Sequence, residues 1–499
     1  MGRRFSRRVF LGGALGSVAG LAQAGAPGIS LRPRVRPPAT AAEVAVRIID
    51  KERPDAAALI REARLGGQVS YAVVDMKSGA LLEANAAEAP MMPASVAKTV
   101  TTLYALDAVG PKYRFETRLL ATGPITDGVL DGDLILAGGG DPGLDTDALA
   151  GMAEALSRTE LREVRGKLRV WAGALPFTRV IDPAQPEQVG YNPSVSGLNL
   201  NYNRVRFEWK RAGDDYALTL DARTARYRPA VRVARISLAA RTLPVYTYSD
   251  GGDHDEWTVA RAALGGDGAR WLPVRKPGAY AAEVFAGFAR ARGIALEIGP
   301  ALAEAPGGRV LVTHKSPPLR EILRRMLKYS TNLTAEIVGM TATARRHGTP
   351  LPLAASAQEM SRWARARLGV EGLRLVNHSG LSDRSRLTAE GLVRALAQNA
   401  QARRLRALLK PFPLGDPGDE GIQVVAKTGT LYFVSALAGY ITTASGRELA
   451  FVIFTANPDR RDRYDPSTGK RPPGARGWTR RARHLQRQLV AHWGRRYGT

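Results

Sequence analysis

The chain has 499 residues, a formal net charge of +26 at pH 7, 44% apolar residues and no cysteine. That length is ample for a buried core and is typical of two or three domains. The absence of cysteine excludes a disulfide framework, a thiol nucleophile and a cysteine-ligated metal centre, while the charge is compatible with nucleic acid, a membrane surface or an anionic polymer as partner.

The first 24 residues are typical of an export signal. Ser6-Arg7-Arg8-Val9-Phe10-Leu11 matches a twin-arginine pattern, a short Gly-rich apolar stretch follows, and Ala22-Gln23-Ala24 is an A-x-A cleavage site. The apolar stretch is too short to span a bilayer of roughly 30 Å. We therefore expect an exported, periplasmic protein. Nucleic acid is not an expected partner, because no nucleic-acid-binding module is recognisable.

A β-hairpin and a helix are predicted after a Pro-, Ala- and Arg-rich leader at 25–45. Residues 69–75 and 80–85 are strand-like and flank a Lys-Ser-Gly turn. A helix is predicted from about residue 95 to 109, since Pro93 stands ahead of it and Gly-Pro follows it. This helix therefore begins at a serine.

Residues 113–275 are rich in short strands and turns, with strands predicted at 129–137, 167–172 and 204–210. The cluster Gly138-Gly139-Gly140-Asp141-Pro142 lies in this block. No Walker-type lysine follows it, which argues against a phosphate loop, and we expect Asp141 to be a turn residue.

Helical patterns return at 280–293, 319–328 and 333–346, and the runs 433–442 and 449–455 indicate a last hairpin. The basic segment that follows ends in a predicted amphipathic helix. Its apolar face consists of Trp478, Ala482, Leu485, Leu489 and Trp493. We expect that face to pack on a sheet, with attachment to a membrane surface as the alternative.

Ser95-Val96-Ala97-Lys98 places a hydroxyl and an amine three residues apart at the start of the first predicted helix. That spacing puts both groups on one helical face. A serine hydroxyl becomes a strong nucleophile when a neighbouring base takes its proton. A lysine can be that base if burial or a second cation lowers its pKa. Taken alone, a capping serine beside a solvated lysine has the same spacing.

Two further motifs follow in a specific order. Ser330-Thr331-Asn332 lies at a break between two predicted helices, and Lys427-Thr428-Gly429-Thr430 opens the run that leads into the last hairpin. The order S-x-x-K, S-x-N, K-T-G is the signature of penicillin-interacting serine enzymes.

With these motifs the chain resembles the D-alanyl-D-alanine carboxypeptidase/endopeptidase family of the penicillin-binding protein 4 type, from about residue 50 to 457. Gly138 to Pro142, Ser196 to Asn203 and Ser379-Gly380-Leu381-Ser382 resemble stretches of that family. The long segment between Ser95 and Ser330 includes the strand-rich block at 113–275, which resembles the accessory domains inserted in that family. Two departures are Asn377-His378, where the family has Asp-Gly or Asn-Gly, and Asp383, where an arginine is usual.

The resemblance implies a role for each catalytic residue. Ser95 would attack the carbonyl between two terminal D-alanines and form an acyl-enzyme, with Lys98 as the base. Ser330 would relay a proton to the departing amine with the help of Lys427, whose charge would also keep Lys98 neutral by repulsion. Asn332 would hydrogen-bond the side-chain amide of the substrate.

The substrate-binding residues implied by the resemblance are Thr428, Gly429 and Thr430, of which the two threonines would bind the terminal carboxylate. Backbone N–H groups of Ser95 and Thr430 would form an oxyanion hole. His378 is either a structural residue or a residue lining the cleft. No metal or organic cofactor is implied, and the histidines lack metal-ligand spacing.

The fold implied is α/β (α+β), a β-lactamase/transpeptidase-like three-layer domain with an antiparallel sheet, interrupted by an inserted β-rich region. The expected segments are a signal peptide at 1–24, a discontinuous catalytic domain at 25–112 and 276–459, an accessory β-rich region at 113–275 and a basic C-terminal segment at 460–499.

The implied activity is that of a serine D-Ala-D-Ala carboxypeptidase, and of a D,D-endopeptidase, acting on peptidoglycan stem peptides, with β-lactams as covalent inhibitors. One alternative is a serine β-lactamase. Against it, no E-x-x-x-N segment lies between Lys98 and Ser330, and the large insertion is foreign to that class. The other alternative is a non-catalytic peptidoglycan-binding protein. The charge further predicts peripheral contact with anionic wall polymer or the membrane surface.

Overall fold

The computed structural model describes residues 55–398, 400–415, 419–465 and 471–498. The predicted signal peptide at 1–24 and leader at 25–45 lie outside these residues. Of the helices in the described part of the chain, none combines the length and hydrophobicity needed to cross a membrane.

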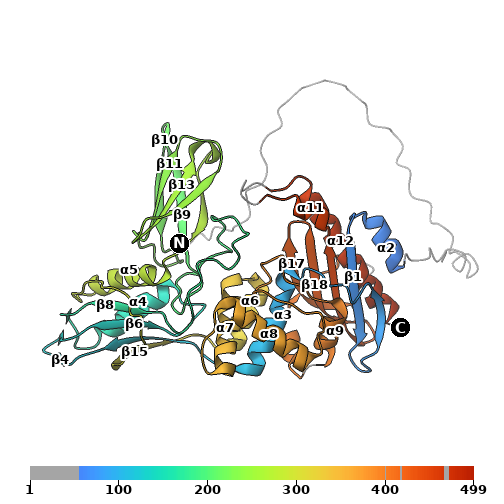
Figure 1. The fold of residues 1–499 in the computed structure, drawn as a ribbon, viewed down its shortest axis with the longest axis horizontal. Coiled ribbons are helices and arrows are strands. Elements are labelled where there is room, and N and C mark those ends of the chain that lie inside the picture. The colour runs from blue at the N-terminus through green and yellow to red at the C-terminus, as the bar shows by residue number, and fades with distance from the viewer. Residues whose placement is uncertain (1–54, 399, 416–418, 466–470, 499) are drawn as a thin grey trace, which may run out of the picture. The chain divides into compact units, whose positions relative to one another are not determined.

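A six-stranded antiparallel sheet forms the centre of the part of the chain that carries the three motifs (Figure 1). Its order is β16 (Lys410–Pro411), β17 (Gln423–Leu431), β18 (Val434–Thr442), β19 (Glu448–Ala456), β1 (Gln68–Asp75) and β2 (Leu81–Asn85). β1 pairs with β19 along its whole length, with Gln68 opposite Ala456. The near-continuous burial of β1, β18 and β19 shows that helices cover both faces of the sheet.

One face of this sheet packs against the first and last helices of the described residues, α2 (Ala56–Ala63) and α12 (Ala475–Arg496). The predicted apolar face of α12 is buried there, with the Trp478 ring 6.1 Å from that of Phe433, so the packing of the tail helix on the sheet is confirmed. The opposite face carries α3 (Ala97–Ala108), α6 (Leu319–Tyr329), α7 (Asn332–His347), α8 (Leu353–Leu368), α9 (Ala389–Gln398) and α10 (Ala402–Leu408). The three-layer fold is therefore confirmed.

The accessory region contains several small sheets with a core of their own. The first has the order β15 (Arg309–Lys315), β3 (Glu116–Ala121), β6 (Leu134–Gly138) and β8 (Leu168–Trp171), alongside helices α4 (Thr146–Ser157) and α5 (Pro277–Arg290), which pack together. Two three-stranded sheets consist of β10 (Asp215–Asp221), β9 (Arg204–Ala212) and β14 (Gly268–Pro273), and of β11 (Ala234–Ala239), β13 (Asp255–Ala260) and β12 (Tyr246–Asp250). The smallest joins β4 (Ile125–Thr126), β5 (Val129–Leu130) and β7 (Glu163–Val164).

The accessory region contains the strand predicted at 129–137 and the turn predicted at Asp141. The single strand expected at 129–137 is wrong, because the chain bends at Asp131 and Gly132 and divides it into β5 and β6. Asp141 is a turn residue as predicted, since its Oδ1 accepts a hydrogen bond of 2.8 Å from the backbone N–H of Gly143.

α5 and β15 both follow residue 275, the expected end of the accessory region, yet they pack with elements that precede it. Residues of α5 belong to the accessory core, and β15 pairs with β3. We therefore propose that the accessory region extends to about residue 315 and that the catalytic part resumes at α6.

Candidate active site

Ser95 lies in a short 3-10 turn, Ala94–Val96, that leads directly into α3. Ala94 has a φ of +44°, a left-handed conformation that is costly for a residue with a Cβ. Gly380 closes over this turn, because a Cβ on it would lie 1.9 Å from the carbonyl oxygen of Ala94. The nucleophile is therefore held on a strained, tightly packed turn at the start of the helix.

Lys98 is fully buried, and its Nζ donates three hydrogen bonds. The acceptors are the Oγ of Ser95 at 3.0 Å, the Oδ1 of Asn332 at 2.8 Å and the carbonyl oxygen of Ser379 at 2.8 Å. Burial lowers the pKa of Lys98 to about 7, although the nearby carboxylate of Glu336 acts to raise it. A substantial fraction of Lys98 is therefore an uncharged base near neutral pH.

Ser330 and Asn332 lie on either side of the junction between α6 and α7. Ser330 caps α6 in the left-handed region with a φ of +57°, and Asn332 is the first residue of α7. While Oδ1 of Asn332 accepts from Lys98, its Nδ2 donates to the backbone carbonyl of Tyr191 at 2.9 Å. Asn332 thereby connects the catalytic lysine to the accessory region.

Lys427 lies on β17 and is 1% exposed. Its Nζ donates to the Oγ of Ser330 at 3.0 Å and to the carbonyl oxygen of Thr428 at 2.6 Å. Burial lowers the pKa of Lys427 well below its usual value, and repulsion from Lys98 lowers it further. Burial is the first cause of the lowered pKa at both lysines, and the repulsion between the two ammonium groups, which acts on both, disfavours their joint protonation.

Strand β17 runs directly beside the nucleophile. A Cβ on Gly429 would lie 2.9 Å from both the carbonyl oxygen of Pro93 and the backbone nitrogen of Ser95, so only glycine allows this approach. Thr430 follows it and lines the cavity, whereas Thr428 is half-buried and does not line it. Of the three predicted substrate-binding residues, Thr430 is thus the one whose side chain faces the cavity.

A cavity of about 920 Å³ opens over Ser95. Three parts of the chain contribute to its lining. They are the motif residues Ser95, Ser330, Asn332 and Thr430, the accessory residues Ala184, Gln185 and Tyr191, and arginines of the C-terminal segment. The cavity is large enough for a peptide and combines a nucleophile with a basic wall.

Glu336 is a buried carboxylate that the motifs did not reveal. Its two carboxylate oxygens accept hydrogen bonds from the backbone N–H groups of His378 at 2.8 Å and Ser379 at 2.9 Å. It therefore fixes the loop whose Ser379 carbonyl accepts from Lys98. Its position four residues after Asn332, on the same face of α7, was the available signal.

His378 does not line the cleft, so that alternative is wrong. The side chain is fully buried, its Nε2 lies 2.9 Å from the Oγ of Ser356, and burial lowers its pKa to about 3. A Cβ on Gly339 would lie 2.2 Å from the His378 ring, so this glycine provides the space that the imidazole occupies.

Arg461, in the basic C-terminal segment, was also missed. It lines the cavity, its Nη2 lies 3.0 Å from the Oδ2 of Asp383, and its Nη1 donates to the carbonyl oxygen of Tyr432 at 3.0 Å. Asp383 stands where the family usually has an arginine. In this chain Asp383 is thus paired with a guanidinium from the C-terminal segment.

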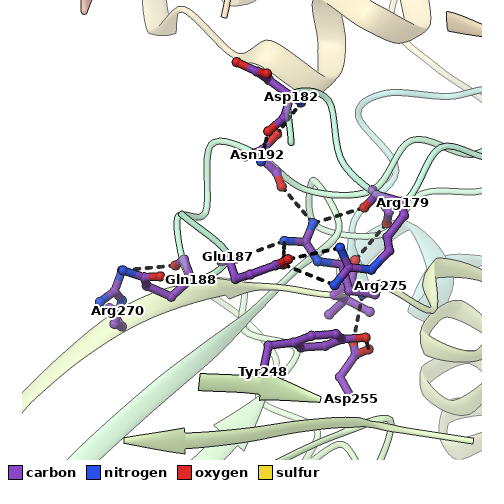
Figure 2. Close-up of polar contacts among 11 residues, drawn as sticks. Arg179, Asp182, Glu187, Gln188, Asn192, Tyr248, Asp255, Arg270 and Arg275 are labelled. Carbon is purple, nitrogen blue, oxygen red and sulfur yellow. Dashed lines mark hydrogen bonds and ion pairs between the residues drawn. The ribbon is translucent and has the colours of Figure 1, made fainter. Parts of the chain in front are cut away.

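Figure 2 shows how the accessory loop that supplies Tyr191 is held. The buried guanidinium of Arg275 donates to the backbone carbonyls of Arg179, Glu187 and Asn192 at 2.8–3.1 Å and to the carboxylate of Glu187 at 3.1 Å. Asn192 in turn exchanges two hydrogen bonds of 2.9 Å with the backbone of Asp182. One buried arginine thus fixes both ends of the loop.

Comparison with known proteins agrees with this geometry. The sequence profile described as the D-Ala-D-Ala carboxypeptidase 3 (S13) family matches residues 54–472. A D-alanyl-D-alanine carboxypeptidase of Actinomadura sp. (strain R39) is 27% identical over 449 residues, covering 80% of each chain. The D-alanyl-D-alanine carboxypeptidase DacB of Haemophilus influenzae is 26% identical over 401 residues, covering 73% of this chain and 80% of that protein.

The fold matches as well. The crystal structure of penicillin-binding protein 4 (DacB) from Haemophilus influenzae gives a TM-score of 0.70 at 20% identity, covering 89% of this chain and all of that one. A structure of the same protein complexed with a β-lactam also gives 0.70. The family match spans most of the chain and includes all three motifs, so the chain belongs to the D-Ala-D-Ala carboxypeptidase 3 (S13) family of serine peptidases.

Proposed function

We propose that this chain removes the terminal D-Ala from peptidoglycan stem peptides through an acyl-enzyme on Ser95, and that it also cleaves D,D-peptide cross-links. The observation that supports this most directly is the Nζ of Lys98, 3.0 Å from the Ser95 hydroxyl, with a pKa lowered to about 7. A base poised near the working pH is what general-base activation of a serine requires.

In the proposed first step, neutral Lys98 takes the hydroxyl proton of Ser95 as Oγ attacks the carbonyl carbon of the penultimate D-Ala. The resulting oxyanion is held by the backbone N–H groups of Ser95 and Thr430. As the C–N bond breaks, the Ser330 hydroxyl gives a proton to the departing amine and recovers one from Lys427, whose Nζ lies 3.0 Å away. Water then attacks the ester carbonyl and one of its protons passes to Ser95 Oγ, which releases the acid and restores Ser95. The proton left on Lys98 returns to Lys427 through the cavity, so that both lysines regain their starting states.

Thr430 is the proposed ligand of the terminal carboxylate, with Thr428 and Gly429 shaping the strand beside it. The same attack on a β-lactam carbonyl would give a stable penicilloyl-Ser95, because the leaving amine stays tethered to the acyl group. The complex of the Haemophilus relative with a β-lactam supports this. The test is labelling by a fluorescent penicillin together with release of D-Ala from a pentapeptide stem. A protein that does neither would overturn the proposal.

Endopeptidase activity needs a separate assay. Purified sacculi would be digested with the protein, and the products identified by mass. We expect loss of cross-linked dimers together with loss of terminal D-Ala. Digests in which only the terminal D-Ala is lost would restrict the enzyme to carboxypeptidase activity.

We further propose export through the twin-arginine pathway to the periplasm, with peripheral contact to anionic wall polymer or the membrane surface. The Ser6 to Leu11 motif and the net charge of +26 support this. Replacing Arg7 and Arg8 together by lysine should leave the precursor in the cytoplasm. Unchanged export of this variant would contradict the proposed route.

A further inference from the structure

Four arginines on α12 form a row along the wall of the cavity. The spacing of four, three and four residues places them on one helical face, opposite the face that packs on the sheet. This arginine row consists of Arg476, Arg480, Arg483 and Arg487, and all four line the cavity that also contains Ser95. At 1.5 Å per residue the row is about 16 Å long.

The arginine row has no acidic partner within the described residues. All four side chains are exposed, and no ion pair to a carboxylate is found for any of them there. The neighbouring Arg461, by contrast, is paired with Asp383. The contact found for the row is a hydrogen bond of 3.2 Å from Arg483 Nη2 to the Oγ1 of Thr430, the proposed carboxylate ligand.

This arrangement does not favour the helix itself. Like charges three or four residues apart destabilise a helix by roughly 0.2–0.5 kcal/mol per pair, and a cation in the first turn, such as Arg476, is unfavourable for the helix dipole. Helix formation therefore does not account for the row. The positive charge of the arginine row would instead stabilise an anionic ligand bound in the cavity.

The geometry also limits which anion fits. A single terminal D-Ala carries one carboxylate, which Thr430 and Arg483 can bind, and a row of about 16 Å extends well beyond it. A membrane surface cannot enter a cavity that also contains the nucleophile. A flexible peptide with several carboxylates fits both the length and the charge of the row.

We propose that the arginine row binds the carboxylates of the second stem peptide in a cross-linked substrate, on the leaving-group side of the scissile bond. This rests on the proposed function, because the scissile bond must lie over Ser95. When the stem is cross-linked through a diamino acid that has a carboxylate beside its side-chain amine, such as diaminopimelate, the departing half has a carboxylate next to the new amine and further free carboxylates along its stem. The row therefore favours cross-linked substrates over monomeric stems.

The test measures binding in a Ser95→Ala background, so that turnover plays no part. Affinities for a purified cross-linked muropeptide dimer and for a monomeric pentapeptide stem are compared in three proteins. These are Ser95→Ala alone, the same protein with Arg480→Gln and Arg487→Gln, and a control with Arg61→Gln and Arg481→Gln. The control removes the same charge from exposed positions outside the cavity. Arg483 is left intact because it contacts Thr430.

We expect the Arg480/Arg487 variant to lose about fivefold in affinity for the dimer, with less than a twofold change for the monomer and none in the control. Unchanged dimer affinity, or an equal loss for both ligands, would overturn the inference. Row-dependent binding to phosphatidylglycerol vesicles without row-dependent dimer binding would assign the row to a membrane surface and also overturn it. The proposed function is tested separately, by turnover of the same substrates by the wild-type protein. Absence of turnover would contradict the proposed function, whatever the binding results.

Discussion

The sheet region and the accessory region contribute to the same cavity in different ways. Ser95 and Lys427 are held by a helix start and a strand packed so closely that a Cβ added to Gly429 would lie 2.9 Å from the backbone nitrogen of Ser95. The accessory region instead contributes Tyr191 from an irregular loop, fixed through the buried guanidinium of Arg275 (Figure 2). The reacting groups thus depend on close backbone packing, whereas the accessory wall depends on a few side-chain hydrogen bonds.

The difference indicates how each part should respond to change. A closely packed backbone leaves no space for an added methyl group near Ser95, so such a group shifts the reacting atoms themselves. A loop held by several hydrogen bonds becomes gradually more mobile as these bonds are removed, and we expect this to change KM more than kcat. The following four predictions, from the largest expected effect to the smallest, test this division.

Ser95, in the sheet region, should be the residue that attacks the substrate. Ser95→Ala removes the attacking oxygen, so D-Ala release should fall by about 10⁴-fold or more, and labelling by fluorescent penicillin should disappear. The melting temperature should stay close to that of wild type. A covalent penicilloyl adduct on the variant would show that another residue is the nucleophile.

Close packing beside the nucleophile is tested with Gly429→Ala. The new Cβ would lie 2.9 Å from the backbone nitrogen of Ser95, and the resulting shift should slow acylation by about 10²-fold. Gly151→Ala is the matched control, since a Cβ at that helical position meets nothing within 4 Å. Equal acylation rates in the two variants would refute the packing argument.

Burial in the sheet region also sets the pH dependence. The pKa of Lys98 is lowered to about 7, so the acylation rate of a neutral ester substrate should rise through pH 7 and level off above it. Below that pH the protonated lysine cannot accept the Ser95 proton. Glu336→Gln removes the carboxylate that acts to raise the Lys98 pKa, so the midpoint should move down. A midpoint that stays or rises would contradict the assignment.

The accessory loop is tested with Arg275→Met, which deletes its hydrogen bonds to the loop carbonyls. We expect KM for a stem peptide to rise by about fivefold while kcat changes less than twofold, because the loop lines the cavity directly but reaches Lys98 only through the hydrogen bond from Asn332 to the Tyr191 carbonyl. Arg270→Met is the control, since Arg270 makes one hydrogen bond to this loop, at Gln188. Equal KM values in the two variants, or a fall in kcat alone, would contradict the view that the accessory loop affects substrate binding and the sheet region affects the reaction.

Much of the sheet region could be predicted from the sequence, because each motif coincides with a local signal. Pro93 marks the helix start at Ser95, the polar Ser-Thr-Asn run marks the break between α6 and α7, and Lys427 lies in the middle of β17, ahead of the predicted hairpin. The expected geometry of these residues follows from secondary structure alone.

The rest of the site could not be predicted, because its contacts join parts of the chain with no shared pattern. Asn332 binds a backbone carbonyl of Tyr191, and any residue type could supply that acceptor. Arg461 pairs with Asp383 across a long stretch of sequence in a segment that is basic throughout, so nothing singles it out. The sequence predicts a lowered pKa for Lys98 through burial or a second cation, but how deeply the side chain is buried depends on packing that only the fold reveals.

The pairing of β1 with β19 has a consequence for synthesis. β1 is among the first strands to leave the ribosome, yet its partner, from Glu448 to Ala456, is among the last. Until then β1 has the short β2 beside it and an open edge on its other side. The six-stranded sheet can therefore be completed only when nearly the whole chain has been made. This predicts slow folding and a nascent chain that needs protection from aggregation.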